Sequence, residues 1–559
     1  MSLSVRRLLS PTLKLATSRT LIRSSTIPLL CQQRLSSLSS IPARAIATTA
    51  IQQQGAAQGS QVMKKTRLGK WGKFFLGLFV LGGVIPMSLL VYYTKREFDF
   101  GPQVPHSPTF PDGSPKKNLV ILGSGWGSIT LLRNLDTSLY NVFVVSPRSY
   151  FLFTPLLPSA PVGTVDITSI TESVRNIARR TPGEVVYLEA EALSVDPENK
   201  SIKARYVTEK EGRENEFDLP YDYLVMGVGS QSTTFNVPGV RENASFLKEI
   251  PDAEQIREKM KFNLAKAAHL KKDDPERERL LRFLVVGGGP TGAEVAAEIR
   301  DYVDEDLSRV SPDLAKEIKI TVIEGHPNIL PMFQKPLIDY TEKHFHSTKI
   351  DMILQTHVTE VEPKSVTAVS KDGTRMCVPY GVLIWTTGTA PRQITKDLIA
   401  KMDPAVQNSK RGLVINERLQ MAGAEDSIFA LGDCSFYPGL MPTAQVARQE
   451  GAYLADLLKK LHRIDHMKWA KEDPQKIKEE FEKIEKFKYH NRGMLAYVGH
   501  EKAIAHIGTT DDSGVSLDGT KGFMLWRRAY LIMCVSMRTR MFVMFDWIKV
   551  RLFGRDTSF

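Results

Sequence analysis

Cysteine is scarce in this chain, and the few cysteines lie far apart. The 559 residues include four, Cys31, Cys377, Cys434 and Cys534, and none belongs to a Cys-x-x-Cys pair. Structural disulfides, zinc sites and iron–sulfur ligation are therefore not expected. Any redox chemistry in this chain must then depend on an organic cofactor.

Acidic residues are absent from positions 1–96, which contain fourteen Lys and Arg. The formal charge of the whole chain is +12, so the remaining residues carry a net charge of −2. A nucleic-acid surface requires a basic stripe on the folded part of a protein. Because the body of this chain is close to neutral, we expect no nucleic-acid partner.

The N-terminal 93 residues predict targeting and membrane insertion. Residues 1–60 are rich in Arg, Ser and Thr, which is typical of a mitochondrial transit peptide; a disordered basic tail is the alternative. Residues 74–93 are twenty residues without a charge, enough for a transmembrane helix, and a buried core helix is the alternative. More positive charge precedes this segment than follows it, so the N-terminal flank is expected on the matrix side.

Two glycine-rich turns, Gly123–Ser128 (GSGWGS) and Gly287–Gly292 (GGGPTG), each follow a short apolar run and each open a predicted helix. Glycines let the backbone approach a pyrophosphate, whose charge then lies on the unpaired amides of the helix N-terminus. A single turn of this kind is as often an ordinary strand-to-helix turn. Two in one chain predict two bound dinucleotides, one delivering a hydride and the other receiving it.

The two predicted sites differ at the residue that meets the ribose. The first site has Ser146, Pro147 and Arg148 where an acid normally accepts hydrogen bonds from the adenosine ribose. Arg148 either contacts the pyrophosphate or is solvated. In the second site, a strand predicted over 318–323 ends at Glu324. This carboxylate suits the ribose hydroxyls of NADH and repels the 2′-phosphate of NADPH; a surface acid is the alternative.

Later segments fit a first nucleotide domain that is interrupted by a second. The strand and turn of 221–229 suit the point where the chain leaves the first domain, and those of 382–388 the point where it returns. Gly432-Asp433 resembles the second signature of two-dinucleotide flavoproteins, in which the Asp bonds the ribityl chain of the flavin. We therefore predict an α/β fold with two Rossmann-type dinucleotide-binding domains.

The C-terminal third contains three further patterns. Gln445 and Gln449 share a face of a helix predicted to begin within 441–450; paired amides suit the two carbonyls of a quinone, or are simply polar helix residues. Residues 457–490 predict a solvated helical hairpin. The stretch 526–553 is basic, aromatic and amphipathic, which predicts a helix in the interface of an anionic membrane, with a dimer-forming core helix as the alternative. Its expected single face comprises Tyr530, Cys534, Met537, Met541, Phe545, Ile548 and Leu552.

Together, GSGWG at 123–127, SPRSYFLFTPLLP at 146–158, GGGPTGAE at 287–294, Gly432-Asp433 and AQVARQ at 444–449 resemble the alternative (type II) NADH:ubiquinone oxidoreductases. The likeness runs from about residue 117 to 559 and is greatest for the external enzymes of fungal mitochondria. It implies non-covalent FAD, NADH as donor, ubiquinone as acceptor and no proton pumping. Hydride passes from NADH to FAD, and two electrons then pass to ubiquinone in the inner mitochondrial membrane, with the catalytic domain facing the intermembrane space.

The resemblance also assigns residues by match of motif. Gln445 and Gln449 take the quinone-site role, and Glu294 lies near the nicotinamide and flavin. No EF-hand loop is found, so no metal site is expected. The cofactor-binding residues are expected to be Gly123, Ser124, Gly125, Trp126, Gly127, Ser146, Pro147, Arg148, Thr154, Gly229, Gly432 and Asp433 for FAD, and Gly287, Gly288, Gly289, Pro290, Thr291, Gly292, Glu324 and Gly388 for NADH.

The implied organisation begins with a transit peptide (1–60) and a transmembrane helix (74–93). An FAD-binding domain in two parts (117–240 and 410–455) holds an inserted NADH-binding domain (280–392). A charged helical insertion (456–490) precedes a C-terminal domain (491–559) that anchors the protein to membrane lipid and forms a homodimer. Two rivals remain: a sulfide–quinone or thiol-linked enzyme, which needs paired cysteines, and a signalling flavoprotein of the apoptosis-inducing-factor type, which needs a basic body.

Overall fold

The computed structural model describes residues 85–98, 100–207, 215–508 and 514–558, which belong to one compact unit. The expected transit peptide (1–60) and residues 74–84 of the expected transmembrane segment lie outside the described residues. The rest of that segment begins helix α2 (Ile85–Phe98). Among the helices of the described ranges, none is both long and apolar enough to cross a bilayer.

The first nucleotide domain is built on a parallel five-stranded sheet in the order β21-β9-β1-β2-β5. Its central strand β1 is almost entirely buried, and the sequence NLVIL explains why, since a strand covered on both faces needs a continuous apolar run. The strands are β1 (Asn118–Leu122), β2 (Asn141–Val145), β5 (Val185–Leu188), β9 (Tyr223–Met226) and β21 (Ile428–Ala430).

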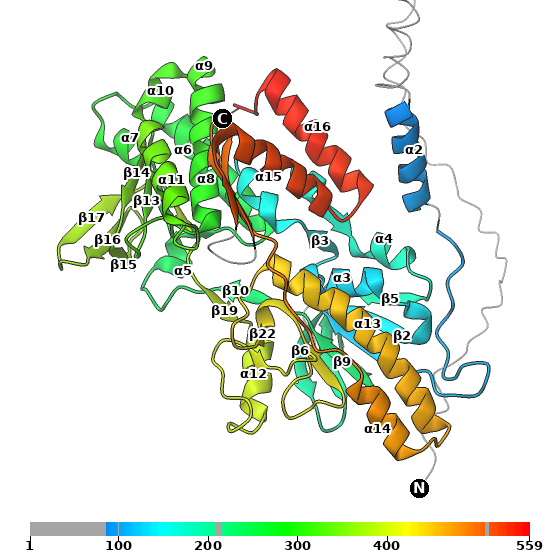
Figure 1. Cartoon of the computed structure of the whole chain (residues 1–559). Helices are drawn as coiled ribbons and strands as arrows, with labels where there is room; N and C mark the ends of the chain where they lie inside the picture. Colours follow the sequence, from blue (N-terminus) through cyan, green and yellow to red (C-terminus); the bar gives the residue numbers. More distant parts are fainter. Residues whose placement is uncertain (1–84, 99, 208–214, 509–513, 559) are drawn as a thin grey trace, which may run out of the picture. The chain divides into compact units, whose positions relative to one another are not determined.

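The second nucleotide domain repeats this architecture with the order β11-β18-β12-β13-β14, again all parallel. Figure 1 shows its sheet beside α6, α8 and α11, away from the first sheet. The strands are β11 (Ser245–Phe246), β12 (Arg282–Val286), β13 (Lys319–Ile323), β14 (Ile350–Ile353) and β18 (Val382–Trp385). The predicted α/β fold with two Rossmann-type domains is confirmed.

Each domain also has an antiparallel three-stranded sheet, and two short strands join the domains. The first extra sheet is β6 (Ala190–Asp196), β7 (Ser201–Tyr206) and β8 (Glu216–Pro220); the second is β15 (Thr356–Val361), β16 (Ser365–Ser370) and β17 (Arg375–Pro379). Antiparallel β10 (Ser230–Ser232) and β19 (Thr389–Pro391) lie where the chain leaves the first domain and returns to it.

Helices cover these sheets and carry the polar residues of the site. The principal ones are α3 (Trp126–Asn134), α6 (Ile250–Ala268), α8 (Pro290–Asp301), α11 (Lys335–Ser347), α12 (Gln393–Lys401) and α13 (Ala444–Trp469). The shorter ones are α4 (Val174–Arg179), α5 (Val240–Asn243), α7 (Pro275–Leu280), α9 (Ser308–Val310), α10 (Pro312–Glu317) and α14 (Pro474–Glu482). Small antiparallel or parallel pairs complete the body: β3 (Tyr150–Leu152) with β4 (Thr171–Ser173), and β20 (Leu413–Val414) with β22 (Ser435–Phe436).

The predicted hairpin of 457–490 is confirmed in outline but is not solvated throughout. α13 extends to Trp469 and α14 follows. Leu457, Leu458 and Leu461 of α13 are buried in the main hydrophobic core, because this helix packs along α3 (Figure 1). The exposed Lys and Glu residues lie on the outer face of α13, on α14 and in the segments that flank α14.

The prediction of one continuous amphipathic face over 526–553 is wrong. A sheet of β23 (Met494–Gly499), β24 (Lys502–Ile507) and β25 (Val515–Leu517) leads into two helices, α15 (Gly519–Met533) and α16 (Met537–Phe553). The chain leaves the helical conformation at Cys534, and the Ser536 hydroxyl caps α16 by accepting a hydrogen bond from the amide of Thr539. The break places Tyr530 and Cys534 in the core and leaves the apolar residues near the end of α16 exposed.

Candidate active site

The first glycine turn lies between β1 and α3, where the sequence predicts it. Gly123 has a φ of +94°, and a Cβ there would collide with the carbonyl oxygen of Gly227 at the end of β9. Gly125 precedes the first turn of α3 without contributing a side chain, so the first amides of the helix are open to an anion. This geometry fits the pyrophosphate of a dinucleotide.

The predicted FAD residues converge on one cavity of about 830 Å³. Residues from the second domain, Thr291 and Gly388, also reach it. Its volume and its glycine-lined wall suit an extended dinucleotide such as FAD. The predicted residues that line it are Gly123, Ser124, Gly125, Trp126, Gly127, Ser146, Pro147, Arg148, Thr154, Gly229, Thr291, Gly388, Gly432 and Asp433.

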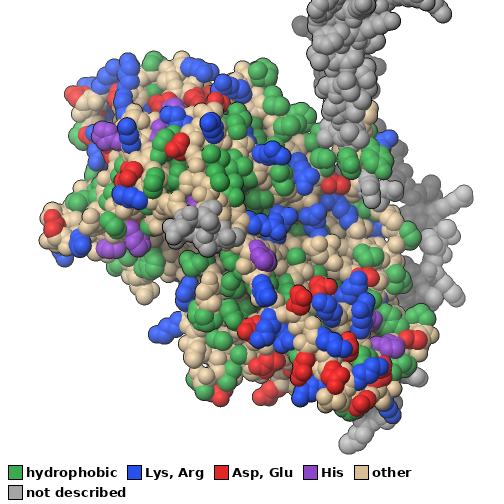
Figure 2. Space-filling view, in the orientation of Figure 1, with side chains coloured by type: hydrophobic (Ala, Val, Ile, Leu, Met, Phe, Trp, Pro, Cys, Tyr) green, Lys and Arg blue, Asp and Glu red, His purple; other side chains and the backbone are tan. Residues whose placement is uncertain are grey.

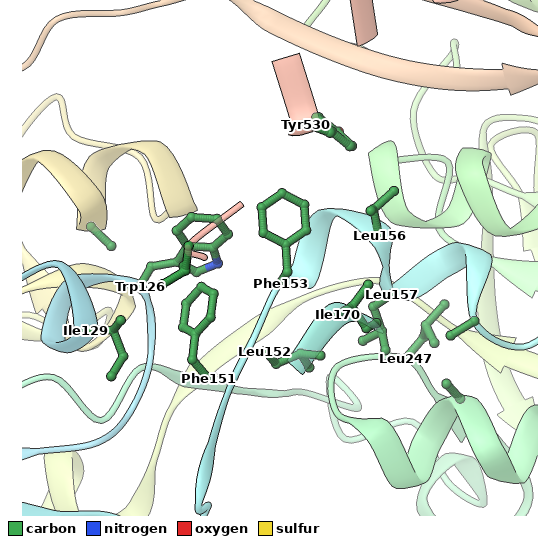
Figure 3. Close-up of a cluster of buried hydrophobic side chains, with 14 of the residues drawn as sticks. Trp126, Ile129, Phe151, Leu152, Phe153, Leu156, Leu157, Ile170, Leu247 and Tyr530 are labelled. Carbon is green, nitrogen blue, oxygen red and sulfur yellow. The ribbon is translucent and has the colours of Figure 1, made fainter. Parts of the chain in front are cut away.

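An aromatic cluster packs behind the first glycine turn. The indole N–H of Trp126 donates a hydrogen bond to the Thr154 hydroxyl (3.0 Å), and the Trp126 ring centroid lies 5.0 Å from that of Phe151. Figure 3 shows Trp126, Phe151 and Phe153 together, with Tyr530 of α15 on the far side of Phe153. The Phe153 and Tyr530 centroids are 6.1 Å apart. The C-terminal helices therefore pack directly on the residues behind the first turn.

Arg148 is not a freely solvated side chain. Its Nη1 lies 2.6 Å from Oε2 of Glu249, and its Nε lies 3.4 Å from the Ser124 hydroxyl in the glycine turn. The hydroxyl of Ser146 donates to the Arg148 carbonyl at 3.1 Å and so fixes the loop after β2. This placement favours the pyrophosphate interpretation of Arg148.

The second glycine turn lies between β12 and α8. A Cβ on Gly292 would collide with the carbonyl oxygen of Gly287, so only glycine permits this close return of the chain. Glu324 follows β13 and accepts hydrogen bonds from the amides of Gly288 and His326 (2.8 Å for His326). The structure thus brings Glu324 against Gly287–Gly292, beside the position of the predicted NADH ribose.

Glu294 lies on the side of α8 that faces β23. Its carboxylate accepts a hydrogen bond from the amide of Tyr497 (3.1 Å) and is 6% exposed. Burial raises its pKa to about 8, and the nearby Glu298 adds to the rise. Asp301, one further turn along, is also buried, and its pKa is raised to about 7, chiefly by burial. Glu294 is therefore largely protonated at neutral pH.

Gln445 and Gln449 extend from the first turns of α13 to the same loop, 489–493. The Gln445 amide oxygen accepts from the Tyr489 hydroxyl (3.0 Å) and the Arg492 amide (2.7 Å). The Gln449 amide group pairs with both backbone groups of His490, at 2.9 and 3.0 Å. The two side chains therefore share a face of α13, as predicted. Loop 489–493, to which both are hydrogen-bonded, contains no sequence motif that would have identified it.

The helix that carries these glutamines is fixed to the first nucleotide site at two points. Gly451 of α13 lies against Gly127 of α3 so closely that a Cβ there would meet the Gly127 carbonyl. The buried carboxylate of Glu450 accepts a hydrogen bond from the amide of Gly432 (2.6 Å), directly before Asp433. Burial raises the pKa of Glu450 to about 7. α13 therefore runs from the Gly432-Asp433 turn outward along the first domain.

Comparison with known proteins agrees with this arrangement. Residues 117–451 match the pyridine nucleotide-disulphide oxidoreductase family, and residues 491–556 match the NDH2 C-terminal domain. The external NADH-ubiquinone oxidoreductase 2 of Saccharomyces cerevisiae mitochondria is 48% identical over 86% of this chain and 88% of its own length. This chain belongs to the type II NADH:ubiquinone oxidoreductases.

Further relatives support the family. The external alternative NADH-ubiquinone oxidoreductase of Yarrowia lipolytica is 45% identical over 81% of this chain and 82% of its own. The solved NDH2 of Plasmodium falciparum in complex with NADH is 29% identical, with a TM-score of 0.70, covering 79% of this chain and 99% of that one. The sulfide:quinone oxidoreductase of Aquifex aeolicus, at 16% identity and a TM-score of 0.58, shares the fold alone.

The cysteines of this type II oxidoreductase argue against thiol chemistry at the flavin. Cys434 follows Asp433 but is fully buried, and its Sγ is directed at the carbonyl oxygens of Met226 (3.1 Å) and Leu431 (3.2 Å). Burial raises the pKa of the Cys434 thiol to about 12. Among the described residues Cys377 and Cys534 are also free cysteines. Cys434 lacks both a cysteine partner and an accessible thiolate, which the rival sulfide–quinone mechanism requires.

The buried Glu294 predicts a specific pH dependence of stability. The folded-state pKa of about 8 lies above the ordinary value of 4.5, so the folded protein keeps a proton that the unfolded chain releases as the pH rises. Between pH 4.5 and about pH 8, the free energy of unfolding of the wild type should therefore fall as the pH rises. Glu294 contributes up to about 1.4 kcal/mol of this fall per pH unit. Glu294→Gln removes that loss.

Chemical denaturation at pH 5 and pH 8 measures the effect. The stability of Glu294→Gln relative to the wild type should rise from pH 5 to pH 8, whereas Glu360→Gln, a change of an exposed glutamate, should show no such trend. A difference that stayed constant with pH would contradict the assignment of a protonated Glu294.

Proposed function

We propose that this chain is a non-proton-pumping external NADH:ubiquinone oxidoreductase of mitochondria. The observation that carries the proposal is the convergence of both nucleotide domains on one cavity whose Gly432-Asp433 edge is tied to α13. The curated relatives in S. cerevisiae and Y. lipolytica are external mitochondrial NADH-ubiquinone oxidoreductases, and the related P. falciparum NDH2 was solved with NADH.

The chain uses FAD and NADH, and ubiquinone is its acceptor. When bound, FAD would supply the redox chemistry that links hydride transfer from NADH to two-electron reduction of the quinone. The first glycine turn and Arg148 bind its pyrophosphate, and Asp433 its ribityl chain. The second turn binds the NADH pyrophosphate, while Glu324 orients the ribose and disfavours NADPH. Most of the catalytic effect is positioning, since the protein holds two rings in contact and excludes water.

Quinone binds at the start of α13, beside Gln445 and Gln449. Support comes from the shared face of the two amides and from the Glu450 and Gly451 contacts that fix α13 at the flavin site. Glu294 and Asp301 are buried acids whose pKa values are raised to about 8 and about 7, and Glu294 lies between the second nucleotide turn and the C-terminal sheet. Glu294 adjusts the environment of the nicotinamide and flavin without acting as a covalent nucleophile.

Gln449→Ala should separate the two half-reactions. Loss of one hydrogen bond to the acceptor, worth about 1 kcal/mol, should slow oxidation of the reduced enzyme by a ubiquinone analogue roughly 5- to 10-fold. The rate of flavin reduction by NADH in anaerobic stopped flow should be unchanged. Gln475→Ala, a change on the exposed helix α14, serves as the control. Equal loss in both half-reactions would refute the quinone assignment.

The exposed part of the C-terminal helices binds the inner mitochondrial membrane. Phe545, Ile548 and Leu552 of α16 are 49%, 46% and 68% exposed, and Met524 and Ile532 of α15 are 61% and 60% exposed. Figure 2 shows hydrophobic side chains over these helices, with Lys and Arg beside them. Apolar and cationic side chains on one face suit an anionic lipid interface.

Replacing apolar residues of this face by charge should release the protein from lipid. Burial of one such side chain contributes about 2 kcal/mol, so Ile548→Asp should weaken binding to vesicles that contain an anionic phospholipid by more than 10-fold in a sedimentation assay. Phe262→Asp, which alters an exposed phenylalanine on α6, should leave binding unchanged. Unaltered binding of Ile548→Asp would contradict the assignment.

Two finer points of the proposal concern assembly and orientation. The catalytic domain faces the intermembrane space, as the charge flanks of segment 74–93 favour; protection of the domain from protease in mitoplasts would contradict this. The C-terminal domain also forms a homodimer, for which the exposed apolar residues of α15 and α16 provide a surface. A monomer by analytical ultracentrifugation in detergent would contradict the dimer.

A further inference from the structure

The connection between β11 and α6 of the second nucleotide domain brings a carboxylate to the cavity of the first nucleotide site. Glu249 lies between β11 and α6, 101 residues after Arg148 in the chain. One carboxylate oxygen lies 2.6 Å from Nη1 of Arg148, and the other lies 3.5 Å from Nη2 of Arg392, on the segment that returns from the second domain. All three side chains line the cavity of the first nucleotide site. The Glu249 carboxylate therefore links its own segment to those of Arg148 and Arg392 at the edge of this cavity.

The Glu249 contact fixes the direction of Arg148. The guanidinium is held on one side by the Glu249 carboxylate and on the other by the Ser124 hydroxyl of the glycine turn, 3.4 Å from Nε. An arginine without such support loses rotamer entropy when it binds a ligand, and that loss weakens binding. A guanidinium held beside the glycine turn is prepared for a phosphate, which it binds with geometric specificity.

Glu249 itself is held in place by the start of α6. The amides of Lys248 and Glu249 both donate to one carboxylate oxygen of Asp252, each at 2.8 Å. The neighbouring Lys248 ammonium donates to the Ser230 hydroxyl (2.9 Å), which in turn donates to Asp433 (2.7 Å). The adjacent residues Lys248 and Glu249 thus reach two sides of one cavity: Glu249 contacts Arg148, and Lys248 is linked through Ser230 to Asp433.

We propose that Glu249 is a positioning residue of the FAD site, supplied by an element far in sequence from the first glycine turn. It acts through Arg148, by holding the guanidinium over the place of the pyrophosphate. On its own, the Glu249 carboxylate would repel a phosphate. Because Arg148 lies between the carboxylate and the place of the pyrophosphate, Glu249 favours FAD binding. The inference rests on the proposed function only in taking the dinucleotide of this cavity to be FAD.

A double-mutant cycle on FAD affinity tests this role. The full chain is stripped of FAD, and rebinding is measured by quenching of flavin fluorescence. Glu249→Gln should weaken FAD binding about 10-fold, and Glu249→Asp should recover part of that loss. In an Arg148→Ala background the Glu249→Gln change should cause no further loss of FAD affinity, because the arginine through which Glu249 favours binding is gone. Glu258→Gln, on the exposed face of the same helix, is the matched control.

The outcomes separate this inference from the proposed function. Unchanged affinity in Glu249→Gln, or an equal loss in the presence and absence of Arg148, would overturn the positioning role while leaving the flavoenzyme assignment intact. A wild-type chain that bound no FAD would instead overturn the proposed function. The melting temperature of the FAD-free Glu249→Gln protein should match that of the FAD-free wild type; a lowered value would show a folding defect and overturn the positioning role.

Discussion

Close backbone contact between α3 and α13 is the constraint on which the arrangement of this enzyme depends. Gly127 and Gly451 let the two helices meet without intervening side chains. α3 begins at the glycine turn of the proposed FAD site, and α13 begins with the two glutamines of the proposed quinone site. A Cβ on Gly451 would collide with the Gly127 carbonyl and separate the helices, and with them the proposed flavin and quinone sites; a Cβ on Gly127 would first meet the side chain of Leu431. The neighbouring Glu450 adds a second link at this point, because its carboxylate accepts a hydrogen bond from the amide of Gly432.

The second nucleotide domain and α13 reach the cavity by different residues. The second nucleotide domain reaches the cavity through Thr291 and Gly388, whereas α13 approaches at the Gly432-Asp433 edge. The C-terminal helices close the structure behind Trp126 and Phe153 through Tyr530. The second domain and α13 thus reach the cavity at different places, which gives the proposed NADH and quinone sites separate approaches.

Much of this arrangement could be predicted from the sequence because it depends on local patterns. The strands NLVIL and RFLVV are buried on both faces, so their apolar runs coincide with β1 and β12. The glycine turns follow from backbone geometry, and the face shared by Gln445 and Gln449 follows from helical spacing. The break at Cys534 could not be predicted, because it depends on how α15 and α16 pack and not on a proline or glycine at that point.

Contacts between distant segments also escaped prediction. Glu249 lies in a connection with no motif, and only the fold brings it to Arg148. The loop 489–493 satisfies the amides of both glutamines, although its sequence is an ordinary polar one. The sequence motif indicates that Glu294 is near the nicotinamide, whereas its burial against Tyr497 and its raised pKa depend on the C-terminal sheet.

Anaerobic titration of the purified chain with NADH tests the central claim most directly. The account predicts a yellow protein with one FAD per chain, whose flavin absorbance is bleached by one equivalent of NADH and restored by a ubiquinone analogue. A colourless protein, or a bound flavin that NADH fails to reduce, would contradict it.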